Sequence, residues 1–415
     1  MRTDFILYVD TTNRQKYWGH SDGTVGPETT TGSAEVLTVR TNYVTMEYVQ
    51  ERIATVHDFT NPVPSAPTDS TAVVVPMTHR EYGVPAAERV LSTLARVDPA
   101  TVVVPLRAPP DRVDSFREWL DGFDVDTELL WCNSEPVESL LARSGVPTDR
   151  GKGRDVWLAL GVAAPDHEYI TVHDADATTY SAAHVPRLLA PLAHEYSFSK
   201  GYYARIEDER LYGRLFRLFV APLIRVLSDR HQAPVLRYLD SFRYALAGEF
   251  AMTAELARSI RAQPSWGLEI GTLGEAFDYC GFEGTAQVDL GFHEHDHRAV
   301  GGETGLADMA DHVGNALFRV LDDHGLDVEY GSLPSAYRRT ANRLVKQYAL
   351  DASMNGLEFD APAEREQVEA YGAAVTPPGE DERLPAWKDV SLSPADLERA
   401  AVRALDGPSL TSGED

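Results

Sequence analysis

The order of apolar and polar positions indicates alternating strands and helices in the first half of the chain. Short β-branched runs, TAVVVP at 71–76 and TVVVPL at 101–106, are typical of buried parallel strands. Two further strands are predicted at 128–132 and 168–173. Helical spacing separates these four strands, over residues 86–97, 111–122 and 153–162. The alternation predicts an α/β fold with a mixed, mainly parallel sheet flanked by helices.

The pattern is looser on either side of this region. We expect a long helix or helix pair at 207–230, a strand at 285–291, and helices at 266–279, 306–324 and 334–352. A loop at 21–33, a helix at 43–57 and a linker at 61–70 are expected before it. From about Asn355 the chain is polar, acidic and proline-rich, which predicts an irregular arm with one helix at 394–405. The expected organisation is an N-terminal extension (1–70), a main domain (71–330) and a C-terminal helix with an acidic, partly disordered tail (331–415).

Composition indicates the cellular environment and the kinds of partner to expect. Among 415 residues, 64 are acidic and 38 basic, for a net charge of −26, and only five are lysines. A surface this acidic suits a cytoplasm of very high salt, where charge repulsion is screened; an ordinary acidic enzyme is the alternative. Nucleic acid is excluded as a partner because polyphosphate would be repelled. Cys132 and Cys280 are expected to be reduced core thiols.

The N-terminal sequence lacks the basic start and apolar run of a signal peptide, and no apolar stretch reaches the ~20 residues that span a membrane. We therefore expect a cytoplasmic protein without a membrane span. Its assembly is left open, a homodimer included.

Two carboxylates, Asp174 and Asp176, directly follow the strand predicted at 168–173. Ligands bind beyond the carboxyl ends of parallel strands, and two carboxylates at i and i+2 can reach one hard cation. Mg²⁺ or Mn²⁺ held in this way can bridge the phosphates of a nucleotide. The alternative is a solvated acidic turn in a chain rich in aspartate.

Lys152 lies between two glycines at the start of the helix predicted at 153–162. Glycines allow a backbone to approach a ligand closely, and a helix N-terminus attracts anions. A flexible loop with a surface lysine is the alternative.

Three histidines, His293, His295 and His297, alternate directly after the strand predicted at 285–291. Alternate residues share a side in an extended chain, so one imidazole can complete a metal site whose other protein ligand is an aspartate. A three-histidine zinc site and a polar loop are the alternatives.

Two further groups are candidates for substrate binding. Glu269 stands among apolar residues at a predicted helix start, where it could accept hydrogen bonds from sugar hydroxyls. Gly213-Arg214 has arginines nearby at 205, 210 and 217, and guanidinium groups bind carboxylate or phosphate bidentately. The alternatives are a solvent-facing glutamate and arginines paired with the acidic residues at 207 and 208.

Six stretches in this order resemble one family, the glucosyl-3-phosphoglycerate synthases, which are retaining glycosyltransferases of the GT-A fold. The stretches are GKGRDVW at 151–157, DAD at 174–176, GRLFRLFVAPL at 213–223, AGEFA at 247–251, GLEIG at 267–271 and AQVDLGFHEHDHR at 286–298. The resemblance covers roughly residues 71–330 and implies a GT-A domain there.

The resemblance implies a role for each matching residue on the donor side. Asp176 and His295 match the protein ligands of the divalent metal, and Asp174 matches the aspartate near the donor's ribose and diphosphate. Lys152 matches a lysine that contacts the donor nucleotide. Glu269 matches the carboxylate that holds the donor sugar's hydroxyls.

The nucleotide and acceptor positions match less completely. Pro76 matches a proline that flanks the base, and Glu81 lies in the loop that helps to hold uridine, although this loop and the strand end at Arg107 lack the usual acidic residues. Gly213 and Arg214 match the acceptor site. His297 stands there for an asparagine, and Phe216 for a threonine.

The function expected from this resemblance is retaining transfer of a hexose from a nucleotide diphosphate sugar, with UDP-glucose favoured, to a small anionic acceptor, with 3-phosphoglycerate favoured. The product would serve compatible-solute synthesis. Mannosyl transfer from GDP-mannose to a glycerate-type acceptor, a nucleotidyltransferase and an inactive sugar-nucleotide-binding regulator remain alternatives.

Overall fold

The structure is a computed structural model that describes residues 5–9, 16–20, 50–147, 149–296 and 303–406. It divides into two compact units, residues 1–49 and residues 50–415. In the first unit, β1 (Phe5–Val9) pairs antiparallel with β2 (Lys16–His20). The loop expected at 21–33 and the end of the C-terminal tail lie outside the described residues. The domain boundaries expected from the sequence stay a prediction.

The second unit is built on a sheet in which ten strands are described, and it is mainly parallel, as predicted. Its order is β3-β12-β9-β11-β8-β4-β6-β5, with β10 paired to β9 and β7 to β6. Only β11 and β10 pair antiparallel to their neighbours. The strands are β3 (Ala54–Val56), β4 (Thr71–Val74), β5 (Met77–Thr78), β6 (Thr101–Arg107), β7 (Thr127–Trp131), β8 (Tyr169–Val172), β9 (Phe198–Glu207), β10 (Arg210–Leu211), β11 (Phe250–Thr253) and β12 (Thr285–His293).

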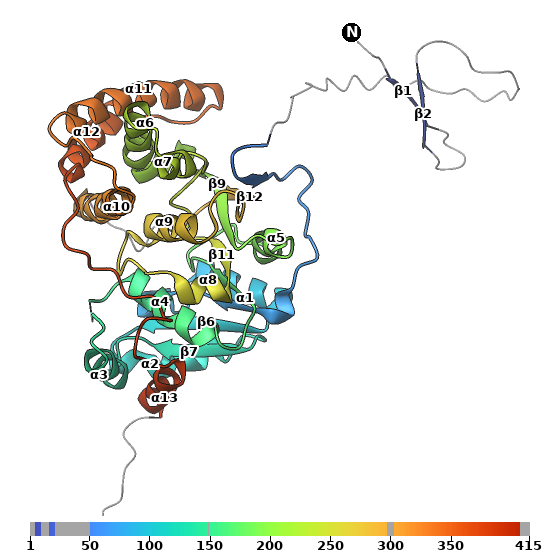
Figure 1. Cartoon of the computed structure of the whole chain (residues 1–415). Coiled ribbons are helices and arrows are strands. Elements are labelled where there is room, and N and C mark those ends of the chain that lie inside the picture. The colour runs from blue at the N-terminus through green and yellow to red at the C-terminus, as the bar shows by residue number, and fades with distance from the viewer. Residues whose placement is uncertain (1–4, 10–15, 21–49, 148, 297–302, 407–415) are drawn as a thin grey trace, which may run out of the picture. The chain divides into compact units, whose positions relative to one another are not determined.

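Helices cover both faces of this sheet (Figure 1). Successive residues of a strand point to opposite faces, so the fully buried β4 supplies Val73 to one core and Ala72 and Val74 to the other. The first core includes residues of α1, α2 and α5, and the second those of α4, α8 and α9. These helices are α1 (Pro85–Val97), α2 (Pro110–Leu120), α4 (Lys152–Ala163), α5 (His184–Leu192), α8 (Ala254–Ser259) and α9 (Leu268–Cys280).

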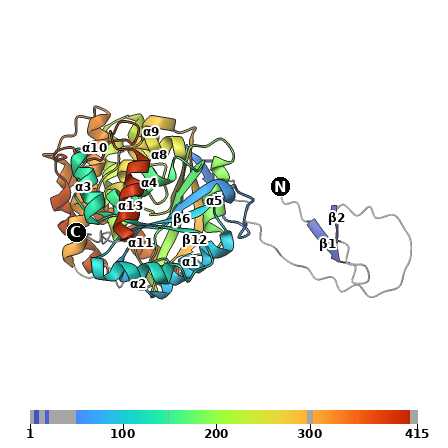
Figure 2. The same ribbon diagram turned by 90° about the horizontal axis from the view of Figure 1, so that it is seen from below.

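The remaining helices extend the second core or close its ends. They are α3 (Glu135–Arg143), α6 (Ala221–Arg230), α7 (Pro234–Leu239), α10 (Glu303–Asp323), α11 (Leu333–Met354), α12 (Ala361–Tyr371) and α13 (Pro394–Leu405). The C-terminal α13 lies beside α3 and α4 (Figure 2). Both cysteines are free thiols, as expected. Within the described residues, none of the helices combines the length and apolar character that crossing a membrane requires.

The prediction of a long helix at 207–230 is wrong for residues 207–214. Glu207 ends β9, and Asp208 and Glu209 adopt φ values of 46° and 57°, which turn the chain into the short strand β10. Helical structure begins only at the π-helix Leu215–Val220 and continues into α6. A turn through two left-handed non-glycine residues has no periodic signal in the sequence. The amphipathic spacing of the helix therefore does not show that the helix begins only after this turn.

Two other expectations also fail. The described part of the helix expected at 43–57 contains β3, whose backbone pairs in parallel with β12. Thr55 in this strand and Ile53 just before it are buried. The arm after Asn355 contains α12, which Asp360 caps by accepting a hydrogen bond from the Ala363 backbone. The helix expected at 394–405 is confirmed as α13.

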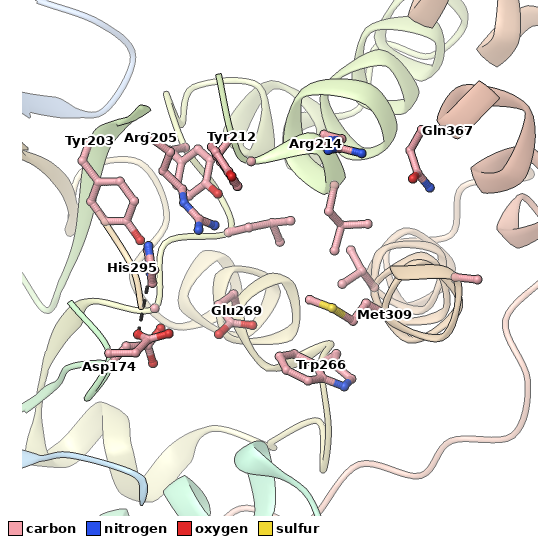
Figure 3. A pocket seen from close by; sticks show the side chains of 18 of the residues that line it. Asp174, Tyr203, Arg205, Tyr212, Arg214, Trp266, Glu269, His295, Met309 and Gln367 are labelled. Carbon is pink, nitrogen blue, oxygen red and sulfur yellow. Dashed lines mark ion pairs between the residues drawn. The ribbon is translucent and has the colours of Figure 1, made fainter. Parts of the chain in front are cut away.

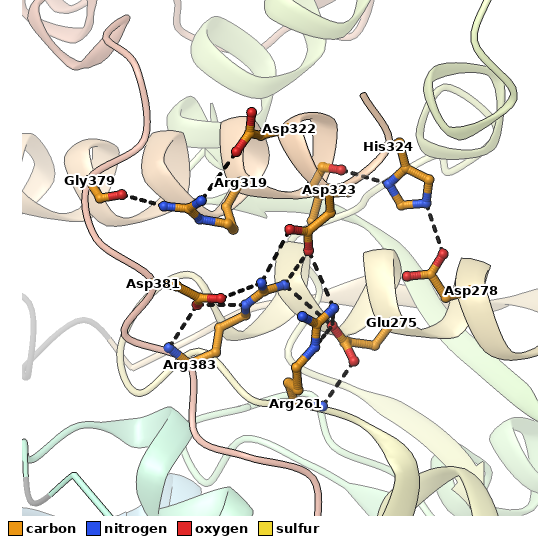
Figure 4. Close-up of polar contacts among 11 residues, drawn as sticks. Arg261, Glu275, Asp278, Arg319, Asp322, Asp323, His324, Gly379, Asp381 and Arg383 are labelled. Atoms are coloured by element: carbon orange, nitrogen blue, oxygen red, sulfur yellow. Dashed lines mark hydrogen bonds and ion pairs between the residues drawn. The ribbon is translucent and has the colours of Figure 1, made fainter. Parts of the chain in front are cut away.

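The segment between α12 and α13, residues 376–393, returns across the second unit and is called here the return segment. Trp387 stacks on Trp157 of α4 with ring centroids 4.3 Å apart, and its indole donates to the Trp157 carbonyl at 2.7 Å. Arg383 binds Asp323 of α10 at 2.5 Å and Asp381 at 2.6 Å. Arg261 shares Asp323 at 3.3 Å, so these charges form one network (Figure 4). The return segment is therefore held by packing at Trp387 and by ion pairs at Arg383.

Replacing Arg383 by methionine should lower the free energy of unfolding by about 2 kcal/mol. The reason is that the Arg383 side chain is only 5% exposed, and its loss leaves the neighbouring carboxylates without their cation. Urea unfolding at fixed KCl measures it. The matched control is Arg399→Met, whose pair with Asp396 is exposed and should contribute less than ~0.5 kcal/mol. Equal losses in the two variants would contradict a stabilising role for the network.

Candidate active site

A cavity of about 690 Å³ lies at the carboxyl ends of the central strands. Seven of the residues predicted from the sequence line it: Lys152, Asp174, Asp176, Gly213, Arg214, Glu269 and His295. The most distant of them, Lys152 and His295, are more than 140 residues apart in the sequence. The side chains of Asp174, Glu269 and His295 lie around the same space (Figure 3). The topology explains the convergence, because loops after parallel strands and the N-termini of the crossover helices meet at this edge of the sheet.

Asp174, Asp176 and His295 form a cluster in which one ligand atom from each lies within 4.8 Å of the others. The loop after β8 and the loop after β12 pair locally like antiparallel strands. Ala177 bridges to His295, and the Asp296 amide donates to the Asp176 carbonyl at 2.8 Å. This backbone pairing brings Nε2 of His295 to 3.9 Å from Oδ1 of Asp176.

The cluster fits a divalent cation. Oδ1 of Asp176 is buried and has no hydrogen-bond partner among the described residues, and burial raises the pKa of Asp176 to about 6. Burial lowers the pKa of His295, but Glu207 and Asp176 outweigh it and raise the pKa above its usual value. A buried carboxylate oxygen without a partner, as at Asp176, favours the binding of a cation, and two carboxylates with one imidazole suit Mg²⁺ or Mn²⁺.

Lys152 bridges two carboxylates. Its ammonium lies 2.6 Å from Asp174 and 3.1 Å from Glu269. Burial raises the pKa of Asp174, but Lys152 has the greater effect and lowers it to about 2. Burial lowers the pKa of Lys152, and the two carboxylates together raise it above its usual value. Lys152 and Glu269 each occupy the first turn of a crossover helix, α4 and α9, which explains how residues 117 positions apart meet.

The glycines beside Lys152 pack closely against the backbone of another segment. A Cβ at Gly151 would lie 2.2 Å from the Pro264 carbonyl oxygen, and one at Gly153 would lie 1.8 Å from that of Gln263. These glycines therefore let α4 approach the backbone before α9, where the Arg154 amide donates to Pro264 at 3.0 Å. They serve helix packing, which in turn sets the distance between Lys152 and Glu269.

Gly248 fixes the space beside Asp174. Antiparallel β11 begins at Phe250, opposite Val172 at the end of β8, so Gly248 lies next to the loop that carries Asp174. A Cβ at Gly248 would lie 2.1 Å from Oδ2 of Asp174. Any larger residue must displace this carboxylate.

Replacing Gly248 by alanine should lower kcat at least ~10²-fold, because displacement of a positioned group by about 1 Å has effects of this size. Steady-state kinetics measure it, with circular dichroism to verify folding. The control is Gly305→Ala in α10, where a Cβ meets nothing within 4 Å. Full activity in Gly248→Ala would show that Asp174 does not need its present position.

Arg214 lies at the other end of the cavity. Gly213, at φ 74°, turns the chain after β10, and Arg214 follows as the N-cap of the π-helix. Of the arginines expected to cluster here, Arg214 and Arg217 share Glu364, whereas the others have different partners. Arg217 is buried against Glu364 at 2.9 Å, whereas Arg210 binds exposed Glu358 at 2.9 Å. Arg205 lines the cavity and pairs with Glu207 at 3.2 Å, as the alternative interpretation anticipated.

Other predicted residues lie elsewhere. Pro76 follows β4 but does not line the cavity, and Glu81 accepts hydrogen bonds from the Thr78 amide and hydroxyl as part of a capping box. His297 lies outside the described residues. His293 is fully buried, stacked on Tyr203 with centroids 4.0 Å apart, and burial lowers its pKa to about 2. Phe216 packs against Tyr244 and does not line the cavity.

Part of the cavity wall could not be predicted from the sequence. Tyr203 lies on β9, Tyr244 lies in an irregular stretch before β11, and Glu366 and Gln367 belong to α12. The spacing of Glu364, Val368 and Tyr371, all buried, could have predicted α12. Nothing local predicts that this helix closes a site formed by residues 150 positions earlier.

Comparison with known proteins assigns the family. None of the protein-family models matches the chain. The glucosyl-3-phosphoglycerate synthase of Methanococcoides burtonii is 30% identical over 399 residues, which cover 86% of this chain and 97% of that protein. The chain belongs to the glucosyl-3-phosphoglycerate synthase family. It is therefore a glycosyltransferase, and the nucleotidyltransferase and regulator alternatives are set aside.

Other relatives in this family agree. The glucosyl-3-phosphoglycerate synthase of Persephonella marina is 34% identical over 325 residues, covering 73% of this chain and 79% of that protein. A crystal structure of the Mycobacterium tuberculosis enzyme in complex with phosphoglyceric acid matches with a TM-score of 0.50 at 22% identity. The match covers 67% of this chain and 90% of that one and shows a common GT-A fold.

Proposed function

We propose that this enzyme transfers glucose from UDP-glucose to 3-phosphoglycerate with retention of configuration. The supporting observation is that seven residues expected from the family motifs line one cavity, with a cation-binding cluster at one end and Arg214 at the other. Its relatives from Methanococcoides burtonii and Persephonella marina carry this activity in their names. The separation of the cluster from Arg214 gives donor and acceptor different subsites.

On the donor side, Asp176 and His295 would hold Mg²⁺ or Mn²⁺, with Asp174 next to them. The bound cation supplies a Lewis acid for the departing diphosphate. Lys152 is held by Asp174 and Glu269 so that its charge faces the same region, and Glu269 retains an oxygen that can accept a hydrogen bond from a sugar hydroxyl. Glu269, bound to Lys152, is poorly placed as a nucleophile, which favours front-face attack by the acceptor hydroxyl.

On the acceptor side, the distribution of charge favours Arg214 as the residue that binds the anionic group of the acceptor. Three lysine or arginine side chains are found among the described residues of the cavity wall: Lys152, Arg205 and Arg214. Lys152 faces two carboxylates and Arg205 binds Glu207 at 3.2 Å. Arg214 is 44% exposed and lies 3.6 Å from Glu364, whose charge is already shared with Arg217. An acceptor's phosphate or carboxylate therefore finds the strongest uncompensated positive charge at Arg214.

A direct assay tests this proposal. Purified protein in high KCl with Mg²⁺ or Mn²⁺ should form glucosyl-3-phosphoglycerate from UDP-glucose and 3-phosphoglycerate, detected by mass spectrometry. GDP-mannose and glycerate serve as competing donor and acceptor, since the loop at 76–81 and Phe216 depart from the family pattern. Faster transfer from GDP-mannose or to glycerate would replace the proposed substrates. No transfer with any pair would refute the assignment.

The net charge of −26 supports two further parts of the proposal. We propose that the protein works in a cell of high internal salt, and that its product belongs to compatible-solute synthesis. A surface this acidic should require salt to screen repulsion, so activity should rise with KCl into the molar range. The cytoplasmic location and a homodimeric assembly stay predictions.

A further inference from the structure

Helix α12 forms one wall of the cavity at its arginine end. Ala363, Glu366, Gln367 and Ala370 of this helix line the cavity. In the close-up, Gln367 and Arg214 lie on the opposite side of the cavity from Asp174 and Trp266 (Figure 3). The donor-side cluster and the α12 wall therefore belong to different ends of the same site.

Glu364 of α12 is shared between two arginines. It accepts from Arg217 through both oxygens, at 2.9 and 3.2 Å, and its Oε1 lies 3.6 Å from Nε of Arg214. Glu364 is 9% exposed and Arg217 8%, whereas Arg214 is 44% exposed and lines the cavity. The carboxylate is thus buried beside Arg214, does not itself line the cavity, and attracts the Arg214 guanidinium.

Arg217 fixes the position of Glu364. Its remaining donors bind the carbonyls of Tyr212, at 2.8 Å, and Leu211, at 3.1 Å, and its guanidinium lies 4.7 Å from the Tyr348 ring centroid. The chain before α12 is also tied to the β10 hairpin, where the Glu358 amide donates to the Glu209 carbonyl at 2.7 Å. Glu364 is therefore a rigid partner for an otherwise exposed arginine.

We propose that Glu364 is a positioning residue for the acceptor: it orients Arg214 toward the anionic group of the substrate while Arg217 holds Glu364 in place. The inference rests on the proposed function only for the identity of that anion. A long arginine side chain loses rotamer freedom on binding, and a fixed carboxylate removes that cost beforehand. Because Arg217 neutralises most of the Glu364 charge, Arg214 keeps its attraction for an anion.

The test compares Glu364→Gln and Glu364→Asp with Glu369→Gln, a control on the same helix whose exposed side chain binds Arg338 away from the cavity. Glu364→Gln removes the charge at the same length, whereas Glu364→Asp keeps the charge but withdraws it from both Arg217 and Arg214. Both should raise the KM for 3-phosphoglycerate roughly tenfold, with the KM for UDP-glucose unchanged. In an Arg214→Met background, Glu364→Gln should add nothing further, since Glu364 acts through Arg214.

Several results would overturn the inference. They are an acceptor KM equal to that of Glu369→Gln, an equal rise in both KM values together with a lower melting temperature, or additive effects of Glu364→Gln and Arg214→Met. Titration calorimetry of 3-phosphoglycerate into the enzyme loaded with UDP and Mg²⁺ separates this inference from the proposed function, because it needs no turnover. A wild type that binds the acceptor without transferring glucose refutes the function, and the Glu364 variants still decide the inference. A wild type that binds no 3-phosphoglycerate refutes both.

Discussion

Replacing Asp176 by asparagine should lower kcat/KM by roughly 10³-fold, because a cation that neutralises a leaving diphosphate supplies several kcal/mol in the transition state. Asparagine keeps the shape of the side chain and removes the charge that, with His295 at 3.9 Å, would hold the cation. The stability of the fold should change little, since Oδ1 of Asp176 makes no hydrogen bond to the described residues. The loss should therefore appear in activity and metal binding and not in unfolding.

The measurement is UDP binding by titration calorimetry with and without Mn²⁺, together with steady-state kinetics. In the wild type Mn²⁺ should strengthen UDP binding, and in Asp176→Asn this metal dependence should disappear. The matched control is Asp166→Asn, an exposed aspartate just before β8 that should retain full activity. If Asp176→Asn keeps metal-dependent UDP binding, the cation is held elsewhere.

Replacing Lys152 by methionine should lower both activity and stability. Methionine fills the space of the lysine's methylene groups but removes the ammonium group, which lies 2.6 Å from Asp174 and 3.1 Å from Glu269. Breaking a largely buried pair in this way costs about 3 kcal/mol of folding free energy. We expect kcat/KM to fall at least ~10²-fold, because Lys152 also supplies charge at the donor side.

The pH dependence of stability separates these two effects. Burial raises the folded-state pKa of Asp174, but Lys152 outweighs burial and the pKa falls to about 2. The stability from this carboxylate is therefore present above pH 4 and is lost as the pH falls through about 2. The stability difference between wild type and Lys152→Met should therefore shrink between pH 4 and pH 2. Urea titrations across this range measure it. A difference that stays constant would mean that Lys152 stabilises the fold by packing and not by its charge.

Local patterns predicted most of the central sheet and its crossover helices. The apolar runs at 71–76 and 101–106 correspond to β4 and β6, and helical spacing at 266–279 and 334–352 corresponds to α9 and α11. These elements could be predicted because burial on both sides of a strand or along one helix face imposes a short-range period on the sequence. Elements without such a period, such as β9 and the turn at Asp208, were missed.

The candidate site also has a part that the sequence predicts and a part that only the tertiary structure shows. Asp174, Asp176, Lys152, Glu269 and His295 could be named in advance because each lies at a strand end or helix start where chemistry is expected, and because the motifs resemble one family. The tertiary structure places them around one cavity. It also shows that the glycines at 151 and 153 pack against the backbone at 263 and 264. The sequence pattern had suggested only that they allow the backbone to approach a ligand.

The sequence by itself therefore determined the α/β architecture, the family resemblance and seven of the residues that line the cavity, because all three are encoded in short stretches of chain. Only the tertiary structure decided which charges compensate one another. The bridge from Ala177 to His295 and the approach of Glu364 to Arg214 each join segments more than 115 residues apart. Contacts of this kind depend on how the elements pack, and packing between distant segments leaves no period or spacing in the chain.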